Sequence, residues 1–467
     1  MKNYKVLLSL IAPSLISIGF TTNSYAADAP LPPQTLFKNV HVWDGTSDGI
    51  TKKISVLVEG NTIKKVRASA SDAHEEAKIV DGNGRILMPG LIDSHVHFNM
   101  MLIPGGIPGI EAANWEQLGG LAMVSAREYI MSGFTTVRDL GGMGVGYKKV
   151  IDSGMAAGPR VYAAGTFISQ TSGHGDFRIG SQPAGTSNAE KLRITALADG
   201  VPEVLKVTRE NFANGSAFVK LMVGGGVSSE KDPLHSEQFS DEEISAVVKS
   251  ASQWDTYSAA HVYHADHIKR ALRLGVESID HGHFIDDEGM KLLVEKDAFL
   301  STNFAAFSQE VLDHPVYGNP DGPQYPKMMQ FLSRGEGFAK LANKYQPKMV
   351  FNTDIVLSTL PVTRLVRDNA MYMHADMMGN LNALKAMTSV GGELALATGQ
   401  NNPYPKKLGV IEAGAYADII LVDGNPLEDI TVLGAHEVIF TRKEMRGETI
   451  DTIDFIMKDG KVYHNDL

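Results

Sequence analysis

The sequence predicts an α/β fold, in which a TIM-like (β/α)8 barrel is joined by a small β-sandwich domain formed from both chain ends. Residues 90–404 alternate short apolar runs with amphipathic helical stretches, as successive β-α units do. Residues 35–89 and the residues after about 409 carry β-branched runs separated by Asp-Gly and Asn-Gly turn signals. A chain of 467 residues is long enough for one large and one smaller domain.

The first 26 residues have the features of a cleavable signal peptide. Lys2 and Lys5 give a positive start, residues 6–20 are an apolar run, and residues 24–26 form a small-x-small cleavage site. The run is shorter than the roughly 20 residues that a membrane span needs. We therefore expect export to the periplasm or the medium, a mature chain beginning at Ala27, and no stable membrane anchor.

The remaining chain divides into three predicted segments. Residues 27–89 are expected to form the N-terminal part of the β-sandwich, residues 90–404 the barrel, and residues 405–467 the C-terminal part of the sandwich. A doubly wound open sheet is the alternative arrangement for the middle segment.

Eight runs in the middle segment are predicted to be barrel strands, and helical patterns such as 121–132 and 241–254 lie between most of them. The runs are LIDSHVH, TTVRDL at 135–140, RVYAAG at 160–165, AFVKLMV at 217–223, YSAAHVY at 257–263, VESIDH at 276–281, AFLSTNF at 298–304 and KMVFNTD at 348–354. Residues 314–327, rich in Pro and Gly, are typical of a lid or an oligomer contact.

Composition excludes several classes of function. The formal net charge of −11, or −13 once Lys2 and Lys5 are removed, disfavours a nucleic-acid partner because phosphate backbones are repelled. The absence of cysteine excludes disulfides, thiol catalysis and cysteine-ligated zinc. Any bound metal must therefore be held by histidine nitrogens and oxygen ligands.

Four histidines end predicted strands. His95 and His97 lie two residues apart at the end of the first strand, so strand alternation sends both imidazoles to the same side. His261 and His281 end two neighbouring strands, and the carboxyl ends of barrel strands are where active sites form. The competing candidates, His264 and His267, fall in the following loop or helix, where solvated or capping histidines are commoner.

Asp354 and Lys220 complete the predicted metal-binding set. Asp354 follows the eighth strand, where it can bind metal and accept a proton, although a helix cap is the alternative. Lys220 lies among apolar residues, where an unpaired ammonium is costly. Reaction with CO2 would give a carbamate able to bridge two divalent metals, and a lysine paired with a nearby acid is the alternative. His174, in TSGHGD, either polarises a substrate carbonyl or is an ordinary loop histidine.

At these residues the sequence resembles the amidohydrolase superfamily. The matching segments are PGLIDSHVHF, VKLMVGGGV, HVYHADHIKRALRLGVESIDHG, FNTD and EAGAYADIILVDGNPLEDI. The superfamily's two-metal layout has His-x-His on strand one, Lys on strand four, His on strands five and six, and Asp on strand eight. VKLMVGGGVSSEKDPLHSEQFSDEEI and TSGHGD resemble the branch of Xaa-Pro-type dipeptidases, N-acyl amino acid hydrolases and ochratoxinases, which cleave an amide before a C-terminal amino acid.

The resemblance implies a role for each of these residues. His95, His97 and Asp354 would bind the first metal ion, His261 and His281 the second, and carboxylated Lys220 would bridge both, with Zn²⁺ the favoured metal. Asp354 would also be the proton carrier, while His174 and Tyr263 would contact the scissile carbonyl or the substrate carboxylate. The expected substrate is a small or dipeptide-like amide, and relatives suggest a homo-oligomer, such as an octamer.

Two other functions remain open at this stage. A hydrolase of a cyclic amide or lactone, similar to imidazolonepropionase, would use the same attacking water, although a bridging lysine disagrees with that enzyme's one-metal arrangement. A binding protein without catalysis on the same barrel is the second alternative, because a fold alone does not imply activity. The complete ligand set disfavours it.

Overall fold

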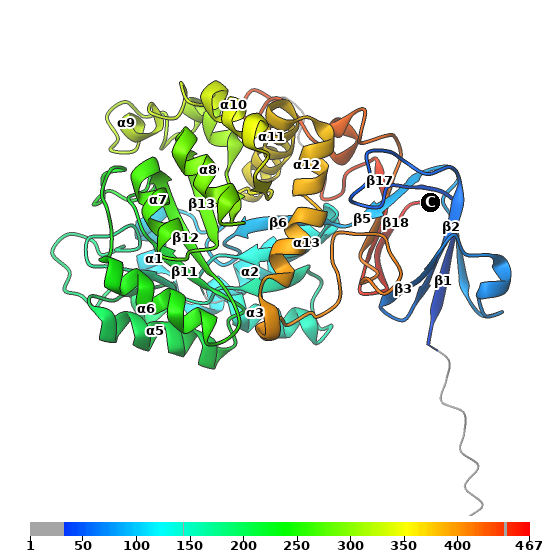
Figure 1. Cartoon of the computed structure of the whole chain (residues 1–467), viewed down its shortest axis with the longest axis horizontal. Coiled ribbons are helices and arrows are strands. Elements are labelled where there is room, and N and C mark those ends of the chain that lie inside the picture. The colour runs from blue at the N-terminus through cyan, green and yellow to red at the C-terminus, as the bar shows by residue number, and fades with distance from the viewer. Residues whose placement is uncertain (1–31, 143, 443–445) are drawn as a thin grey trace, which may run out of the picture.

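A computed structural model describes residues 32–142, 144–442 and 446–467, so the predicted signal peptide lies outside the described residues. Figure 1 shows two parts: parallel strands surrounded by helices, and beside them a sheet to which both ends of the chain contribute.

The middle of the chain forms two parallel sheets, which confirms a mixed α/β fold with a parallel sheet. The larger is seven-stranded, in the order β10-β9-β11-β12-β13-β14-β15, and the smaller is three-stranded, in the order β6-β7-β8. Their bounds are β6 Leu91–Val96, β7 Phe134–Asp139, β8 Arg160–Ala163, β9 Phe167–Ser169, β10 Thr195–Leu197, β11 Val219–Met222, β12 Ser258–His264, β13 Ser278–Phe284, β14 Phe299–Ser301 and β15 Lys348–Met349.

The strands differ from the predicted series at two places. Two short parallel strands, β9 and β10, lie between the third and fourth predicted strands, and β11 pairs with β9. The eighth predicted run contains only the two-residue strand β15, yet the chain beyond it remains hydrogen-bonded to its neighbours. The Val350 amide donates to the Leu300 carbonyl (3.0 Å), and the Ser94 amide of β6 donates to the Phe351 carbonyl (2.9 Å).

Backbone hydrogen bonds therefore join the two parallel sheets at both sides. The segment after β15 lies beside β6, where the Asp354 amide donates to the His95 carbonyl at 3.0 Å. At the other side, the Ala217 amide before β11 donates to the Ala163 carbonyl of β8 at 2.8 Å. These contacts bring the carboxyl ends of β6, β11, β12 and β13 toward one region, together with Asp354.

Helices cover the parallel strands, and a helix with one apolar face packs that face against the core. Helix α6, for example, starts with a capping box made by Ser240 and Glu243 and packs Ile244 and Val247 into the core beneath it. None of the helices in the described residues has the length and apolar character needed to cross a membrane. The helices are α1 Gly106–Ala112, α2 Trp115–Met131, α3 Gly144–Asp152, α4 Asn188–Lys191, α5 Val201–Asn214, α6 Asp241–Ser252, α7 Ala265–Arg273, α8 Asp287–Glu295, α9 Tyr325–Met328, α10 Gly335–Tyr345, α11 Leu360–Met378, α12 Asn380–Ala386 and α13 Ser389–Leu396.

An eight-stranded sheet combines strands from both ends of the chain. Its path runs β18-β17-β16-β5-β1-β2-β3, with β4 paired to β1. One apolar core, including Phe37, Leu87, Ile419 and Phe455, unites the two ends. The bounds are β1 Gln34–Val42, β2 Ile54–Glu59, β3 Thr62–Val66, β4 Lys78–Asp81, β5 Ile86–Pro89, β16 Ile419–Val422, β17 Ile453–Lys458 and β18 Lys461–Asn465.

Candidate metal centre

The predicted ligands gather at the carboxyl ends of the parallel strands. His95 lies near the end of β6 and His97 directly follows this strand, while β11 contributes Lys220, β12 His261 and β13 His281. All five side chains are buried. Asp354, which follows β15, is about a quarter exposed, with 25% of its side-chain surface accessible.

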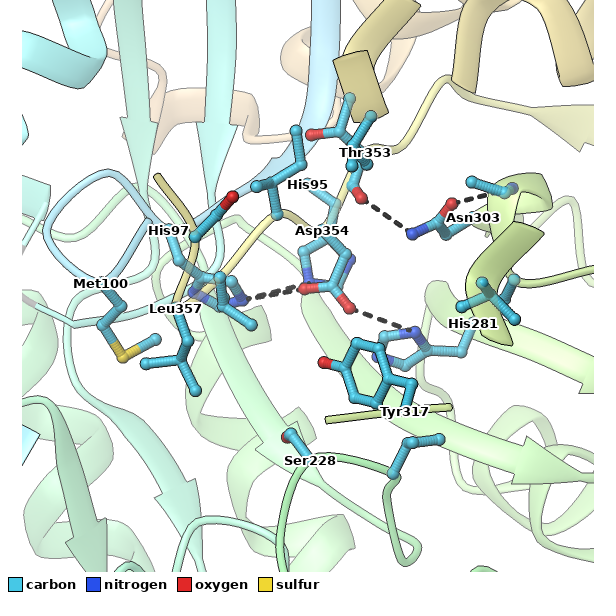
Figure 2. Close-up of a pocket in the computed structure, with 18 of the residues that line it drawn as sticks. His95, His97, Met100, Ser228, His281, Asn303, Tyr317, Thr353, Asp354 and Leu357 are labelled. Atoms are coloured by element: carbon cyan, nitrogen blue, oxygen red, sulfur yellow. Dashed lines mark hydrogen bonds and ion pairs between the residues drawn. The ribbon is translucent and has the colours of Figure 1, made fainter. Parts of the chain in front are cut away.

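His95, His97 and Asp354 form the tightest contact in the cluster. Nε2 of His95 and Nε2 of His97 lie 3.2 and 3.4 Å from Oδ1 of Asp354, and 3.3 Å from each other (Figure 2). Nδ1 of His97 lies 3.1 Å from the Gly141 carbonyl, so Nδ1 must carry the hydrogen. Nε2 of His97 is thereby left with its lone pair toward the cluster, as metal ligation requires.

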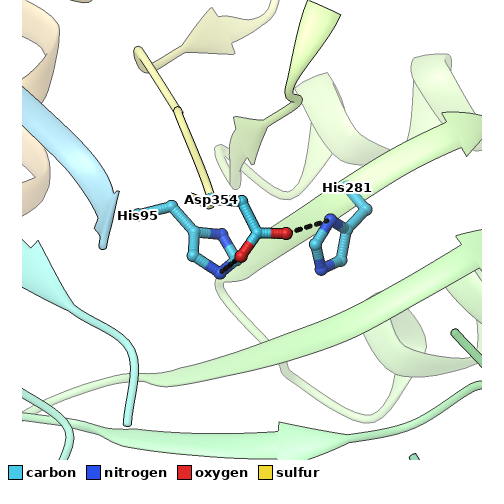
Figure 3. A group of neighbouring side chains, drawn as sticks. All are labelled: His95, His281 and Asp354. Atoms are coloured by element: carbon cyan, nitrogen blue, oxygen red, sulfur yellow. Dashed lines mark ion pairs between the residues drawn. The ribbon is translucent and has the colours of Figure 1, made fainter. Parts of the chain in front are cut away.

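The other carboxylate oxygen of Asp354 faces the second pair of histidines. Oδ2 lies 3.8 Å from Nδ1 of His281, so the carboxylate stands between His95 and His281 (Figure 3). The ligand atoms of these three residues lie within 4.8 Å of one another. The ring centroids of His261 and His281 lie 4.3 Å apart. Imidazole and carboxylate donors at this spacing, without sulfur, suit divalent metals such as zinc.

The backbone at His281 and Asp354 is unusual. Their φ angles are 75° and 46°, in the left-handed region, which costs about 1–3 kcal/mol for a residue other than glycine. Ser278 and Asp280 both contact Arg138, so regular alternation along β13 would turn His281 to the opposite side. The left-handed conformation instead lets Asp280 and its neighbour His281 both face inward.

Burial sets the protonation of most of these groups. It lowers the pKa of His95 to about 4 and holds the pKa values of His261 and His281 well below the usual value, so all three are neutral near pH 7. Burial would raise the pKa of Asp354, but the neighbouring His95 and His97 lower it overall. His95, His261 and His281 thus present neutral imidazoles beside an ionised carboxylate, which are the forms that bind cations, whereas the contact with Asp354 raises the pKa of His97 against the effect of burial.

Lys220 is fully buried and paired with an acid. Its ammonium donates to Oδ2 of Asp280 at 2.7 Å, and Oδ1 of Asp280 accepts from Arg138 at 2.5 Å. Burial lowers the pKa of Lys220 despite this partner. Sequence reasoning named Lys220 but did not identify Asp280 or Arg138, because neither residue lies in a recognisable ligand pattern.

His174 and Tyr263 lie beside the second pair of histidines. The His174 ring stacks on His261 with centroids 4.1 Å apart and planes at 15°, and the Tyr263 ring stacks on His281 at 4.7 Å. The loop that carries His174 follows β9 rather than the third predicted strand.

The competing histidines are placed differently. His264 is the last residue of β12, rather than part of the following loop or helix, and His267 lies in α7. Neither is among the described residues that line the pocket.

A pocket opens above the cluster and has a largely apolar wall. Tyr317, from the predicted lid or contact stretch, lines the pocket together with Asp354 (Figure 2), and burial raises its pKa to about 12. Glu310 accepts hydrogen bonds from the backbone amides of Ile439 and Phe440, which also line the pocket. The apolar lining includes Met100, Ile107, Ile110, Phe167, Phe177, Met222, Val227, Val311, Phe331, Ile355, Val356, Leu357, Ile439 and Phe440.

Sequence reasoning did not predict Tyr317, Ile439 or Phe440 as pocket residues. The stretch containing Tyr317 was singled out by its Pro and Gly content, but no sequence signal relates residues 439–440 to a site formed by strands more than 80 residues away.

Comparisons with known proteins identify the family of the chain. The model of the amidohydrolase family matches residues 86–464. Ochratoxinase from Aspergillus niger is 29% identical over 408 residues, which cover 82% of this chain and 78% of that one.

The solved structures that are similar to this chain include relatives of the same kind. A prolidase complexed with N-methylphosphonate-L-proline has a TM-score of 0.82 and 28% identity, covering 92% of this chain and 100% of that one. The crystal structure of the A. niger ochratoxinase has a TM-score of 0.76 and 25% identity, with coverage of 93% and 96%. A Xaa-Pro dipeptidase with methionine bound in its active site has a TM-score of 0.75 and 28% identity, with coverage of 92% and 100%.

Proposed function

The chain belongs to the amidohydrolase family and is a hydrolase that acts on amide or peptide bonds, and from this premise we propose that it releases a C-terminal amino acid from an N-acyl amino acid or dipeptide-like amide using two metal ions. The observation that carries the proposal is the approach of His95, His97 and His281 to Asp354 beneath an apolar pocket. The similarity to an ochratoxinase and to prolidases supports this choice of bond.

Two groups of residues would hold the metal ions. His95, His97 and Asp354 would bind one, and His261 and His281 the other, with zinc the favoured ion. Bound there, the ions would supply Lewis acidity that activates a water molecule and polarises the amide carbonyl.

Lys220 would join the two ions as its carbamate. Its pKa is lowered by burial, which favours the neutral amine that attacks CO2, forming an N–C bond and releasing a proton. The carbamate keeps one N–H, so it can still donate to Asp280, the present partner of the Lys220 amine. Arg138, also bound to Asp280, supplies positive charge beside the new anion.

The side chains around the cluster would carry the remaining steps. Asp354, held ionised by His95 and His97, takes a proton from the attacking water and delivers it to the leaving nitrogen, because an amide nitrogen is a poor leaving group until it is protonated. His174 and Tyr263 contact the scissile carbonyl or the carboxylate of the substrate. The apolar wall binds the acyl group and keeps bulk water out.

Metal analysis together with product analysis tests the proposal. The purified protein should contain about two divalent ions per chain, and a panel of N-acyl amino acids, Xaa-Pro dipeptides, cyclic amides and lactones should show release of a free C-terminal amino acid. Hydrolysis restricted to lactones or cyclic amides would replace the proposed bond. An inactive, metal-free protein would instead indicate a binding function on the same fold.

The same reasoning extends to architecture and location. We propose that residues 90–404 form one closed (β/α)8 barrel, supported by the backbone hydrogen bonds that join the parallel sheets, and that residues 27–89 and 405–467 form one sandwich-like domain around their common core. The signal-like segment supports export, and a homo-oligomer is proposed only by the resemblance to the superfamily.

A further inference from the structure

The loop at residues 224–233, between β11 and α6, lies behind His174. Its central group is Asp232, whose side chain is fully buried. Oδ2 of Asp232 lies 3.1 Å from Nδ1 of His174 and accepts the Gly226 amide at 2.7 Å. The hydroxyl of Ser229 donates to the other oxygen and lies 2.9 Å from Nδ1 of His174. This carboxylate is not among the described pocket-lining residues and takes no part in the steps proposed above.

The charge of Asp232 decides which nitrogen of His174 carries a hydrogen. Burial opposes ionisation, but His174, Ser229 and Lys327 together hold the pKa of Asp232 below its ordinary value. An ionised carboxylate can only accept hydrogen bonds, so Nδ1 must be the donor. Among the described residues, none forms a hydrogen bond with Nε2 of His174, and the His174 ring lines the pocket. Nε2 is therefore the nitrogen that can meet a substrate.

Lys327 holds this loop in place. Its ammonium, contributed by α9, donates to the carbonyls of Gly226, Ser229 and Asp232 at 2.7, 2.7 and 2.8 Å. All three donor hydrogens of the ammonium are thus used on one loop.

Close packing between the loop and the ring gives a second restraint. A Cβ atom at Gly226 would lie only 2.0 Å from the His174 ring, so only glycine allows the loop to approach this closely. The Lys327 contacts and the close packing both fix the distance between the Asp232 carboxylate and His174.

We infer that Asp232 is a positioning residue for His174. Asp232 fixes the orientation of the His174 ring and the hydrogen on Nδ1, so that Nε2 is presented to the substrate, and Lys327 holds the loop that carries Asp232. The inference rests on the proposed role of His174 at the site. A hydrogen-bond partner of a metal-bound histidine is typically worth about 10- to 100-fold in metal affinity or activity. We expect a similar factor for His174, because its ring would otherwise rotate or take the other tautomer. Metal binding should be unaffected, since Asp232 contacts none of the proposed ligands directly.

A double-mutant cycle provides the test. In Asp232→Asn, the amide can present its own N–H to Nδ1, which opposes the required tautomer, and kcat on N-acetyl-L-phenylalanine should fall about 10- to 100-fold with KM and metal content little changed. In the His174→Ala background, the same substitution should cause almost no further loss. A further tenfold loss there would overturn the inference, because Asp232 would then act independently of His174.

Controls separate positioning from a general loss of stability. Asp176→Asn removes another buried carboxylate of the same region, one that pairs with Arg178 and not with His174, and should leave kcat within a few-fold of wild type. Should Asp232→Asn not fold, Ser229→Ala keeps the charge and removes only one contact to Nδ1. It should give a smaller loss of kcat that also vanishes in the His174→Ala background, and a loss of equal size in both backgrounds would refute the inference.

A crystal structure of the metal-loaded Asp232→Asn variant is independent of activity. We expect the His174 ring to be rotated or displaced from its stack on His261. An unmoved ring with an intact contact to the introduced amide would contradict the inference. If the wild-type protein hydrolyses none of the tested amides, the proposed function fails, while this structural result still decides the positioning role.

Discussion

Replacement of Asp354 by asparagine should separate metal binding from proton transfer. Asparagine keeps a carbonyl oxygen near Nε2 of His95 and Nε2 of His97, which lie 3.2 and 3.4 Å from Oδ1 of Asp354. It also tolerates the φ of 46° at this position, so the backbone needs no rearrangement. An amide cannot carry a proton from water to the leaving nitrogen, and a positioned general base is typically worth about 10²–10⁴-fold. This factor corresponds to about 3–5 kcal/mol of activation free energy.

The assay combines steady-state kinetics with metal analysis by mass spectrometry. The variant should retain at least part of its metal while kcat falls by about two to four orders of magnitude. Asp139→Asn is the matched control, because Asp139 is a buried carboxylate near the same strand ends whose contacts are to the Phe98 and Gly141 amides and the Tyr147 hydroxyl. Its kcat should fall less than about tenfold. Activity of Asp354→Asn within a few-fold of wild type would refute the assignment and require another base.

Three further predictions concern the bridge, acid stability and export. Lys220→Ala should lose metal and activity together, and short carboxylates or bicarbonate should restore part of both, whereas Lys220→Arg should not be rescued because its guanidinium stays charged. A bare Lys220 amine in the crystal structure of a fully metallated, active enzyme would exclude the carbamate. Burial lowers the pKa of His374 from 6.5 to about 4, so the folded state binds fewer protons than the unfolded state and the free energy of unfolding should fall as the pH drops from about 6.5 toward 4. Urea titrations at pH 7 and pH 5 should show a smaller loss of this free energy for His374→Leu than for wild type, and equal losses would contradict the assignment. Mass spectrometry of exported protein should find Ala27 as the first residue, and an intact Met1 would refute the signal peptide.

The parallel strands could be predicted where the apolar runs were long enough to show a pattern. Strands β12 and β13, with seven residues each, overlap the predicted runs 257–263 and 276–281. Strands β9 and β10, with three residues each, lie in apolar stretches too short to establish an alternation, whereas the three-residue strand β14 lies within the longer predicted run 298–304. Strands β9 and β10 are held in place by pairing with each other and with β11, which is tertiary information that the local sequence does not contain.

The candidate ligands could be named because strand geometry relates sequence spacing to direction. His95 and His97, two residues apart at the end of β6, show this most simply. His281 departs from the rule, because regular alternation would direct Asp280 inward and His281 outward. Its φ of 75° overrides the alternation, and the sequence around it contains no signal for that conformation. Its identification depended on the matching position of His261 on the neighbouring strand and on family resemblance.

The substrate-facing wall is harder to predict for a physical reason. Most of the candidate ligands lie on strands or directly after them, so that their direction follows largely from the pleat, whereas Tyr317, Ile439 and Phe440 lie on irregular segments whose positions depend on single polar contacts. Glu310, through its hydrogen bonds to the backbone amides at 439 and 440, connects two segments separated by more than 120 residues. A change at such a contact would reshape the pocket without touching a ligand. The bond that is cleaved and the group that is accepted are therefore determined by different parts of the chain, and only the first follows from a sequence motif.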